Sequence, residues 1–556
     1  MTRDPLKRSI RRWFIAWIGL ASVAAASAGF ADTGAAQHQA PGRTMAQQAV
    51  SHKEIWITTD HSKHEILKQP FHSGEEVTRA CLACHSEAAA QFHKTIHWTW
   101  LDPNVPREKQ IGKAGYSINN FCISIHGNEP RCTSCHAGYG WKDKSFDFTD
   151  QSKVDCLVCH EQTGTYQKFP TAAGNPVQEP TLFKENNKTY LPPEWNKVAQ
   201  SVGRPTRKNC GTCHFTGGGG DGVKHGDLDS SLTKPNKSLD VHMGKDGQNF
   251  DCVRCHTTVL HNIAGRTYAT PAAKDRKSLV EDDLTAKITC ESCHTSTPHE
   301  AGSKPNDHTD KVACQSCHIS RFARVNPTKM VWDWSTAGKK RDGKPYQEQG
   351  PLGKPVYDSK KGDFVWAKNV TPAYFWWNGS IEAITAKDMI DPGGTVRINW
   401  PVGSREGKNA RIFPFKVHEG KSPYDKVNKT LLIPHLFGPP GSDAFWAAFD
   451  WKRAFESGMR QAGLPYSGEY DFVETTYVYP TTHMVAPKSE TVSCGECHTR
   501  QGSRLAGLTG FHMPARDPFK VVNVLGWGLV LASLVGVLIH GIGRIFAGGK
   551  HRTSGK

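Results

Sequence analysis

The stretch that decides the fold is Asn119–His136, NNFCISIHGNEPRCTSCH, followed by DCLVCH at Asp155–His160. Each run ends in a Cys-x-x-Cys-His motif, here called a box, and Cys122 belongs to neither box. Such a box attaches a c-type haem: two thiols bond covalently to the porphyrin, and the adjacent histidine ligates the iron. The stretch therefore predicts a haem protein with a spare thiol ahead of one haem.

The box occurs eight times, and the boxes are numbered here from first to eighth in chain order. Their cysteines are Cys81/Cys84, Cys132/Cys135, Cys156/Cys159, Cys210/Cys213, Cys252/Cys255, Cys290/Cys293, Cys314/Cys317 and Cys494/Cys497. Their histidines are His85, His136, His160, His214, His256, His294, His318 and His498. A zinc or disulfide scaffold would not end its cysteine pairs in histidine so consistently. The sequence therefore predicts eight covalently attached c-type haems.

The composition agrees with a haem-filled interior. The formal charge of +16 is typical of nucleic-acid binders. No basic run interleaved with aromatic residues supports such a function, and two propionates on each haem would offset the charge. Only 37% of the residues are hydrophobic, and 52 are glycine, so the porphyrins themselves are expected to fill the core. The predicted fold is mainly α with long irregular loops and minor β structure, packed around the eight haems.

The sequence patterns at both ends of the chain are typical of targeting segments. A basic start, the apolar run Trp13–Ala28 and small residues after it are typical of an export signal, with an uncleaved anchor as the alternative. Val521–Ile542 is apolar and long enough to span a bilayer. The basic tail beyond it favours a cytoplasmic C-terminus. The predicted organisation is a signal peptide (residues 1–31), a periplasm-facing octahaem domain (32–515), a transmembrane anchor (516–548) and a cytoplasmic tail (549–556).

Local patterns predict a few elements between these ends. A helix is expected to begin at Ser86 and to carry His93 and His97 on one face. The four glycines within Phe215–Lys237 predict a loop. Intervals of 24 residues separate the second box from the third and the sixth from the seventh, so the haems of each pair are expected to touch.

The region 319–493 has no box and is rich in tryptophan and tyrosine. Alternation in Thr395–Trp400 predicts strand, and apolar spacing in Ser442–Leu464 predicts one amphipathic helix. We expect this region to cover haem faces and to supply iron ligands.

Each iron has two axial positions, and the boxes supply one ligand apiece. An iron between two histidines passes electrons, whereas a catalytic iron needs a weak or displaceable ligand. The predicted distal ligands lie near boxes or in aromatic or glycine-flanked loops, with His418, His435 and His512 as reserves. They are His61, His97, His242, His261, His299, His308 and His483.

Two residues outside the boxes carry possible chemistry. Cys122 is either a buried structural thiol or a reactive thiol that exchanges with a sulfur–sulfur bond, and Asn119 would face the same pocket. Lys224 lies in the run GGGGDGVKHGD. It is either a solvated charge or an iron ligand that burial keeps deprotonated. Asp221, three residues earlier, could orient the amine or donate protons.

The runs DHSK, HKTIHWTW, NNFCISI, NEPRCTSCHAGYGWKDKSFDF, KVDCLVCH and CGTCHFTGGGGDGVKHGDLD resemble the octahaem tetrathionate reductase family over nearly all of residues 55–515. The resemblance implies that the second box holds the active-site haem and that an axial lysine, matching Lys224, replaces a second histidine. It also implies that Cys122, Asn119 and Asp221 surround that pocket. The C-terminal anchor and His126 depart from the family's pattern.

The predicted function is therefore a membrane-anchored reductase, in which seven bis-histidine haems feed one haem ligated by His136 and Lys224. The substrate would be a small inorganic sulfur or nitrogen compound: tetrathionate, nitrite or hydroxylamine. The donor would be quinol-linked, in the inner membrane or the periplasm, and nucleic acid is no partner. The alternative is a non-catalytic electron conduit whose irons are all six-coordinate.

Overall fold

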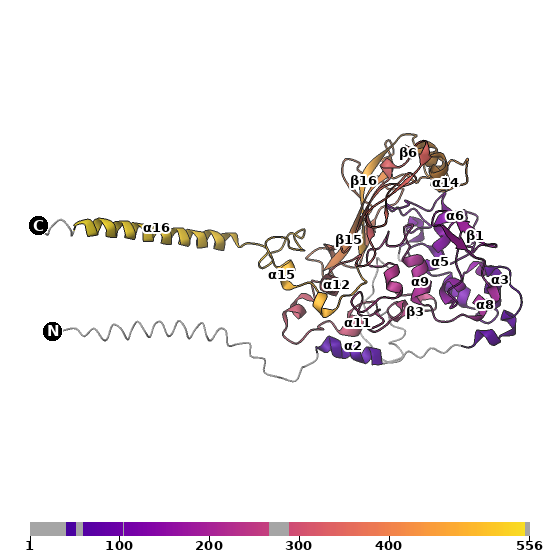
Figure 1. The fold of residues 1–556 in the computed structure, drawn as a ribbon, viewed down its shortest axis with the longest axis horizontal. Helices are drawn as coiled ribbons and strands as arrows, with labels where there is room; N and C mark the ends of the chain where they lie inside the picture. Colours follow the sequence, from indigo (N-terminus) through magenta and orange to yellow (C-terminus); the bar gives the residue numbers. More distant parts are fainter. Residues whose placement is uncertain (1–39, 52–58, 104, 266–287, 551–556) are drawn as a thin grey trace.

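The structure is a computed structural model that describes residues 40–51, 59–103, 105–265 and 288–550. The predicted signal peptide and most of the predicted cytoplasmic tail lie outside these residues. Figure 1 shows a body of short helices and loops beside a tall sheet, with one long helix projecting from the body. The helices before the sheet are α2 (Pro41–Ser51), α3 (Gly74–Leu82), α4 (Ala88–Phe92), α5 (Ile96–Thr99), α6 (Glu129–Cys132), α7 (Leu157–His160), α8 (Trp195–Gln200), α9 (Arg207–His214), α11 (Glu291–His294) and α12 (Cys314–His318).

The sheet is larger than the minor β content that the sequence predicts. It has eight strands in the order β13-β16-β15-β5-β10-β9-β8, with β11 paired to β15. Its strands are β5 (Thr328–Asp333), β8 (Gln347–Gln349), β9 (Pro355–Asp358), β10 (Gly362–Ala367), β11 (Ala373–Trp377), β13 (Val396–Arg397), β15 (Arg411–Asp425) and β16 (Tyr470–Pro480). Four two-stranded ribbons accompany it: β1 (Thr181–Phe183) with β2 (Lys188–Tyr190), β3 (Thr258–Val259) with β4 (Asn262–Ile263), β6 (Lys340–Arg341) with β7 (Lys344–Pro345), and β12 (Ile381–Ala383) with β14 (Asn399–Pro401).

The long antiparallel pair β15–β16 runs in register from Phe415 opposite Pro480 to Asp425 opposite Tyr470. Successive residues of a strand point to opposite faces. Accordingly, Tyr477 and Tyr479 join one aromatic cluster, whereas Val478 joins another. The pair therefore packs on both faces.

Two predicted helices are each interrupted. Ser442–Leu464 forms α13 (Phe445–Ala448) and α14 (Trp451–Ala462), because Phe449 takes a left-handed conformation and the Asp450 carboxylate caps the second helix. The helix predicted from Ser86 starts at α4 instead, with Glu87 at its N-cap, and an extended Thr95 separates it from α5.

Other local predictions agree with the structure. The Thr395–Trp400 run contributes to β13 and β14. Residues 215–237 form turns and the short 3-10 helix Ser230–Thr233, with Gly218, Gly219 and Gly222 at positive φ, where glycine carries no steric penalty.

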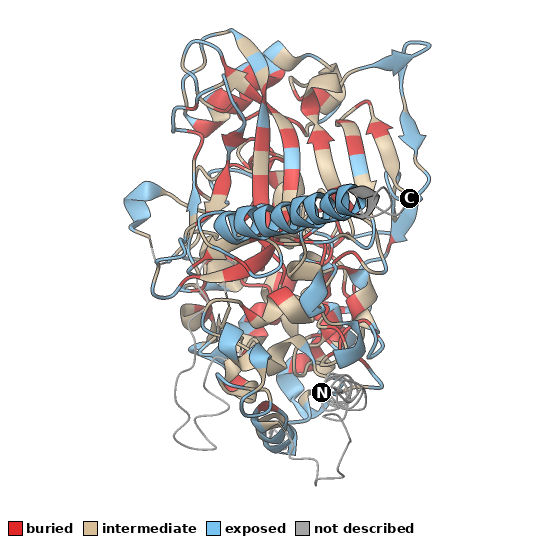
Figure 2. Cartoon of the chain, turned by 90° about the vertical axis from the view of Figure 1, so that its left-hand side faces the viewer, coloured by how far each residue is buried: buried red, intermediate tan, exposed pale blue. Residues whose placement is uncertain are grey.

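The C-terminal part holds α15 (Cys494–Cys497) and α16 (Lys520–Lys550). Within the segment Lys520–Ala547 of α16, an 18-residue window has a mean hydropathy of 2.2 and no burial against the rest of the protein. It contains the predicted Val521–Ile542 span. Figure 2 shows the helix exposed along its length, and Figure 1 places α15 close to its start. By length and composition, α16 can cross a membrane.

Candidate functional site

One branched cavity of about 4500 Å³ runs through the box-bearing region. The cysteines of all eight boxes line it, as do seven of the eight box histidines. The histidine that does not line the cavity is His136 of the second box. The cavity therefore connects all eight boxes, and the second box differs from the others in that its histidine lies outside the cavity.

Six box histidines face a second histidine across this cavity, with ring centroids 6.0–6.3 Å apart. A metal–imidazole bond of about 2 Å on each side of an iron, plus about 1.2 Å from each nitrogen to its ring centre, gives roughly 6.4 Å. The spacing therefore fits a haem iron between each pair. The pairs are His85 with His61, His214 with His97, His256 with His483, His294 with His242, His318 with His299, and His498 with His308.

The structure thus places six of the seven predicted distal histidines opposite a box histidine. The seventh, His261, lies within electrostatic range of His160, and burial together with that neighbour lowers the pKa of His261. Among the reserves, the Nδ1 atom of His435 lies 3.1 Å from the Ser457 hydroxyl, and His512 packs on Phe519. His418 is fully buried in the sheet region and does not line the cavity.

Hydrogen bonds orient several of these rings. The Nδ1 atoms of His160, His256 and His498 lie 2.9, 2.8 and 2.9 Å from the backbone carbonyls of Gly203, Ala264 and Pro514. Such a bond fixes Nδ1 as the donor and leaves Nε2 free to ligate a metal.

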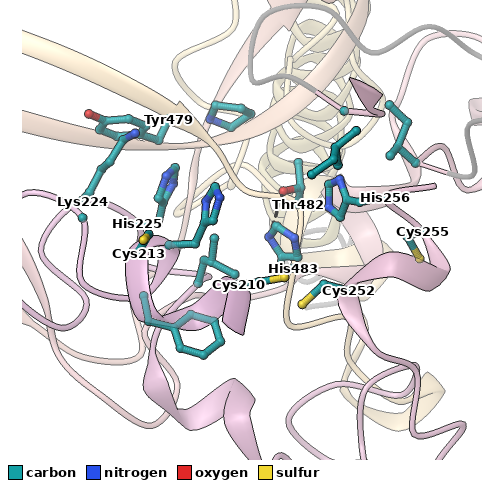
Figure 3. Close-up of a pocket in the computed structure, with 18 of the residues that line it drawn as sticks. Cys210, Cys213, Lys224, His225, Cys252, Cys255, His256, Tyr479, Thr482 and His483 are labelled. Carbon is teal, nitrogen blue, oxygen red and sulfur yellow. Dashed lines mark hydrogen bonds between the residues drawn. The ribbon is translucent and has the colours of Figure 1, made fainter. Parts of the chain in front are cut away.

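Asp227 orients the His483 ring in the same way, although no pattern in the sequence predicts this role. Its carboxylate lies 3.3 Å from His483 Nδ1 and accepts the backbone N–H groups of Thr482 and His483 at 2.8 and 3.0 Å. Burial opposes the charge, but the bond to His483 prevails and lowers the pKa of Asp227 to about 2. A carboxylate behind a ligating histidine raises the histidine's basicity. Figure 3 shows His483 between Cys210 and Cys252, facing His256.

The second box is built differently, and its geometry does not favour the expected ligation of iron by His136. The His136 N–H bonds to the Thr133 carbonyl, as in a 3-10 turn. In the third and sixth boxes the corresponding N–H bonds to the carbonyl of the first cysteine.

The tighter turn sends the His136 ring away from the cavity. The ring is fully buried, with centroids 5.1 and 4.9 Å from those of Trp98 and Trp141. Its Nε2 lies 2.8 Å from the Trp98 carbonyl, while Nδ1 has no partner within the described residues. The nitrogen that would bind iron is therefore engaged elsewhere.

Lys224 lies close to the second box. It lines the cavity beside Cys135, and its Nζ is 5.5 Å from the centre of the Tyr479 ring. Figure 3 shows the Lys224 side chain directed toward Tyr479, close to Cys213. Burial, reinforced by the charge of Lys113, lowers the pKa of the Lys224 amine to about 7. Near neutral pH, a large fraction of this amine therefore carries a free lone pair, as an iron ligand must.

Cys122 and Asn119 lie on a loop that also lines this cavity. The Cys122 sulfur would be 3.9 Å from a Cβ atom at Gly219, so this loop meets the glycine run that precedes Lys224. The Asn119 side chain donates to the Ile123 carbonyl and accepts from the Phe121 N–H, each at 3.0 Å. Ile123 has φ +68°, a costly conformation for a β-branched residue. Asn119 therefore holds a strained turn that presents Cys122.

Asp221 does not lie where the sequence predicts it. It does not line the cavity, and its carboxylate accepts the Ser230 N–H at 2.8 Å, the Ser230 hydroxyl at 2.7 Å and the Asn326 amide at 3.2 Å. The chain turns at Gly222, with φ +69°, between Asp221 and Lys224. Asp221 therefore ties down the loop and does not orient the amine directly.

Contacts between cysteines show which boxes are neighbours. The thiols of Cys81 and Cys156, Cys135 and Cys213, Cys210 and Cys252, and Cys290 and Cys314 interact directly. Cysteines of the third and fourth, fifth and sixth, and seventh and eighth boxes lie within electrostatic range of each other. Cysteines of the sixth and seventh boxes, and of the second and fourth boxes, are therefore in contact. The second and third boxes meet through the backbone beside them, where the Asp155 N–H donates to the Ala137 carbonyl at 3.1 Å. The order is first, third, fourth, fifth, sixth, seventh, eighth, with the second box branching from the fourth.

Comparisons with known proteins agree with covalent haem attachment. Family models described as "Cytochrome c bacterial" and "Cytochrome c554 and c-prime" match residues 329–501 and 80–161. An uncharacterized protein of Archaeoglobus fulgidus is 23% identical over 291 residues, which is 45% of this chain and 90% of that protein. The crystal structure of octaheme cytochrome c from Shewanella oneidensis is 44% identical, with a TM-score of 0.69, and the match covers 80% of this chain and 95% of that chain. The chain therefore belongs to the family of multihaem c-type cytochromes represented by that octahaem protein.

Proposed function

We propose that this protein is a membrane-anchored, periplasm-facing reductase with eight haems, and that the haem of the second box reduces a small inorganic sulfur or nitrogen compound. The observation that carries the proposal is the exclusion of His136 from the cavity while the Lys224 amine lies beside the second box. A haem held there would receive the Lys224 amine and no imidazole from its own box. An iron with an open position supplies redox chemistry to a bound substrate.

The cavity has room for eight haems. An eighth of 4500 Å³ is about 560 Å³, which is within the roughly 300–1000 Å³ typical of a site for one small molecule. The eight boxes and the connected cavity thus fit eight haems.

The order of the boxes supports a route from the membrane to the substrate. The eighth box lies beside α16, and the His498 ring bonds to Pro514, six residues before that helix. From there the seventh, sixth, fifth and fourth boxes follow in contact, and the fourth leads to the second. A quinol-linked donor in the membrane would therefore deliver electrons at the eighth box, and the third and first boxes form a side branch.

Carbon monoxide tests the proposed open iron. A pyridine haemochrome assay is expected to give eight haems per chain. CO added to the reduced protein is then expected to change the absorption of about one haem in eight, because bis-histidine irons have no free position. A CO response from none of the haems would contradict a catalytic site.

The second candidate is an electron conduit. The six closely spaced histidine pairs, the contacts between boxes and the membrane-length helix favour it. A conduit needs no open iron, so the absence of a CO response would favour this function instead.

Lys113 offers a test of the substrate's charge. It is exposed, lines the cavity, and acts electrostatically on Lys224 and on both cysteines of the second box. Lys113→Gln is expected to raise KM for the anions nitrite and tetrathionate by up to about tenfold, since a cation near a site concentrates anionic substrates. KM for hydroxylamine, which is neutral above pH 7, should hardly change. Steady-state assays with reduced viologen at low and high salt would measure this difference.

The matched control is Lys109→Gln. Lys109 also lines the cavity, four residues earlier, and is not among the charges that act on Lys224. Equal effects of both variants on all three substrates would show that Lys113 has no special effect on anions.

A further inference from the structure

Lys416 is a buried lysine outside the cavity. It lies on β15 with 2% of its surface exposed, opposite Tyr479 of β16. An ammonium taken out of water is unstable unless its N–H groups are satisfied. The groups that accept its hydrogen bonds therefore indicate the role of Lys416.

All three ammonium donors of Lys416 have an acceptor. Nζ donates to the backbone carbonyls of Val223 at 2.9 Å and Lys224 at 3.1 Å, and to the Thr328 hydroxyl at 2.6 Å. Thr328 extends this hydrogen-bond network to Gly222, because its hydroxyl donates to the Gly222 carbonyl at 2.7 Å. A lysine has three donors and no acceptor, so this set is complete.

These bonds hold three consecutive carbonyls, from Gly222 to Lys224, at the point where the glycine-rich segment turns. Glycine-rich backbone has little conformational preference of its own. Two residues of the sheet restrain this segment. Lys416 binds the backbone of Lys224, and Tyr479, which lies opposite Lys416 on β16, contacts the Lys224 side chain.

We propose that Lys416 is a positioning residue, which holds the Gly222–Lys224 backbone on the sheet so that the Lys224 amine points at the haem of the second box. This inference rests on the proposed function, in which Lys224 ligates that haem. Thr328 extends the same restraint to Gly222. Lys416 touches neither haem nor substrate in this arrangement.

Lys416→Met tests the proposal, since methionine has a similar length and no donor. The full-length holoprotein is measured in two ways: the absorption and EPR signals of the second-box haem, and the reaction of Lys224 with an amine-directed acetylating reagent, read by mass spectrometry. A ligated amine is protected from acetylation. Lys416→Met is expected to shift the absorption and EPR signals of the second-box haem toward those of Lys224→Ala and to raise labelling of Lys224 by at least about tenfold. Thr328→Val should cause a smaller change in the same direction.

Ser422→Ala is the matched control, because Ser422 is a buried polar residue of the same strand that bonds across to Thr475. It should change neither signal. Unchanged protection and spectrum in Lys416→Met would overturn the inference. If that variant does not fold, an unchanged Thr328→Val would overturn it equally. The proposed function fails separately, if Lys224→Ala keeps the spectrum of the unaltered protein.

Discussion

Replacing Lys224 by alanine is expected to lower the reduction of tetrathionate, nitrite and hydroxylamine by about 100-fold or more, since loss of a group that only orients a metal ligand already costs up to about that factor. The remaining boxes keep their histidines, so the protein should fold with all its haems attached. Assays with reduced viologen would measure the rates, and EPR would show a change in only one haem. Lys224→His separates removal of the ligand from its replacement, since an imidazole at this position should restore a nitrogen ligand to the iron and part of the activity.

Lowering the pH should have the same effect on the second-box haem as Lys224→Ala. The pKa of the Lys224 amine is about 7, well below that of a free lysine, because the site is buried. Above pH 7 the lone pair is free, and below it the proton competes with the iron. Metal binding itself favours the deprotonated amine, so the loss of the lysine-ligated signal should occur at or below about pH 7. A signal that stays unchanged in Lys224→Ala would show that another group ligates this iron.

Much of the haem framework can be predicted from sequence, because a box encodes covalent chemistry in five adjacent residues. Six predicted distal histidines also lie opposite box histidines, although their pairing depends on tertiary contacts. His308, for example, faces His498, which is 190 residues away. The sheet is less predictable, since β15 (RIFPFKVHEGKSPYD) contains two prolines and lacks strict alternation. The break at Phe449 depends on a single left-handed residue inside an amphipathic pattern.

The candidate site depends on contacts that the local sequence does not encode. CTSCH has the same Cys-x-x-Cys-His pattern as every other box, yet its His136 ring points away from the cavity and packs between Trp98 and Trp141. Asp221 lies three residues before Lys224, but a glycine at positive φ directs it elsewhere. Lys416 and Asp227 act through contacts with residues distant in sequence, and nothing in their own neighbourhoods distinguishes them.

Cys122→Ser is expected to lower tetrathionate reduction by about 100-fold while nitrite and hydroxylamine reduction stay within about threefold, because only a substrate with a sulfur–sulfur bond can exchange with a thiolate. In the proposed reaction, the Cys122 thiolate attacks a central sulfur of tetrathionate. A bond forms between Cys122 and one thiosulfate unit, and the central sulfur–sulfur bond breaks and releases the other as thiosulfate. Two electrons from the haems then cleave the new bond, which releases the second thiosulfate and restores the thiolate. Parallel viologen assays with the three substrates would test the difference.

Ser124→Ala is the control for this prediction. Ser124 lines the same cavity on the same strained turn and carries no thiol, so its loss should affect all three substrates alike and only slightly. Cys122 also packs against the aromatic cluster around Trp332 and Trp334, so a packing role must be distinguished from a role in thiol exchange. A packing role predicts that Cys122→Ser weakens all three activities together, along with thermal stability. Trapping would decide between the two roles, because tetrathionate added to the oxidised protein should attach one thiosulfate unit at Cys122, detectable by mass spectrometry and released by reduction.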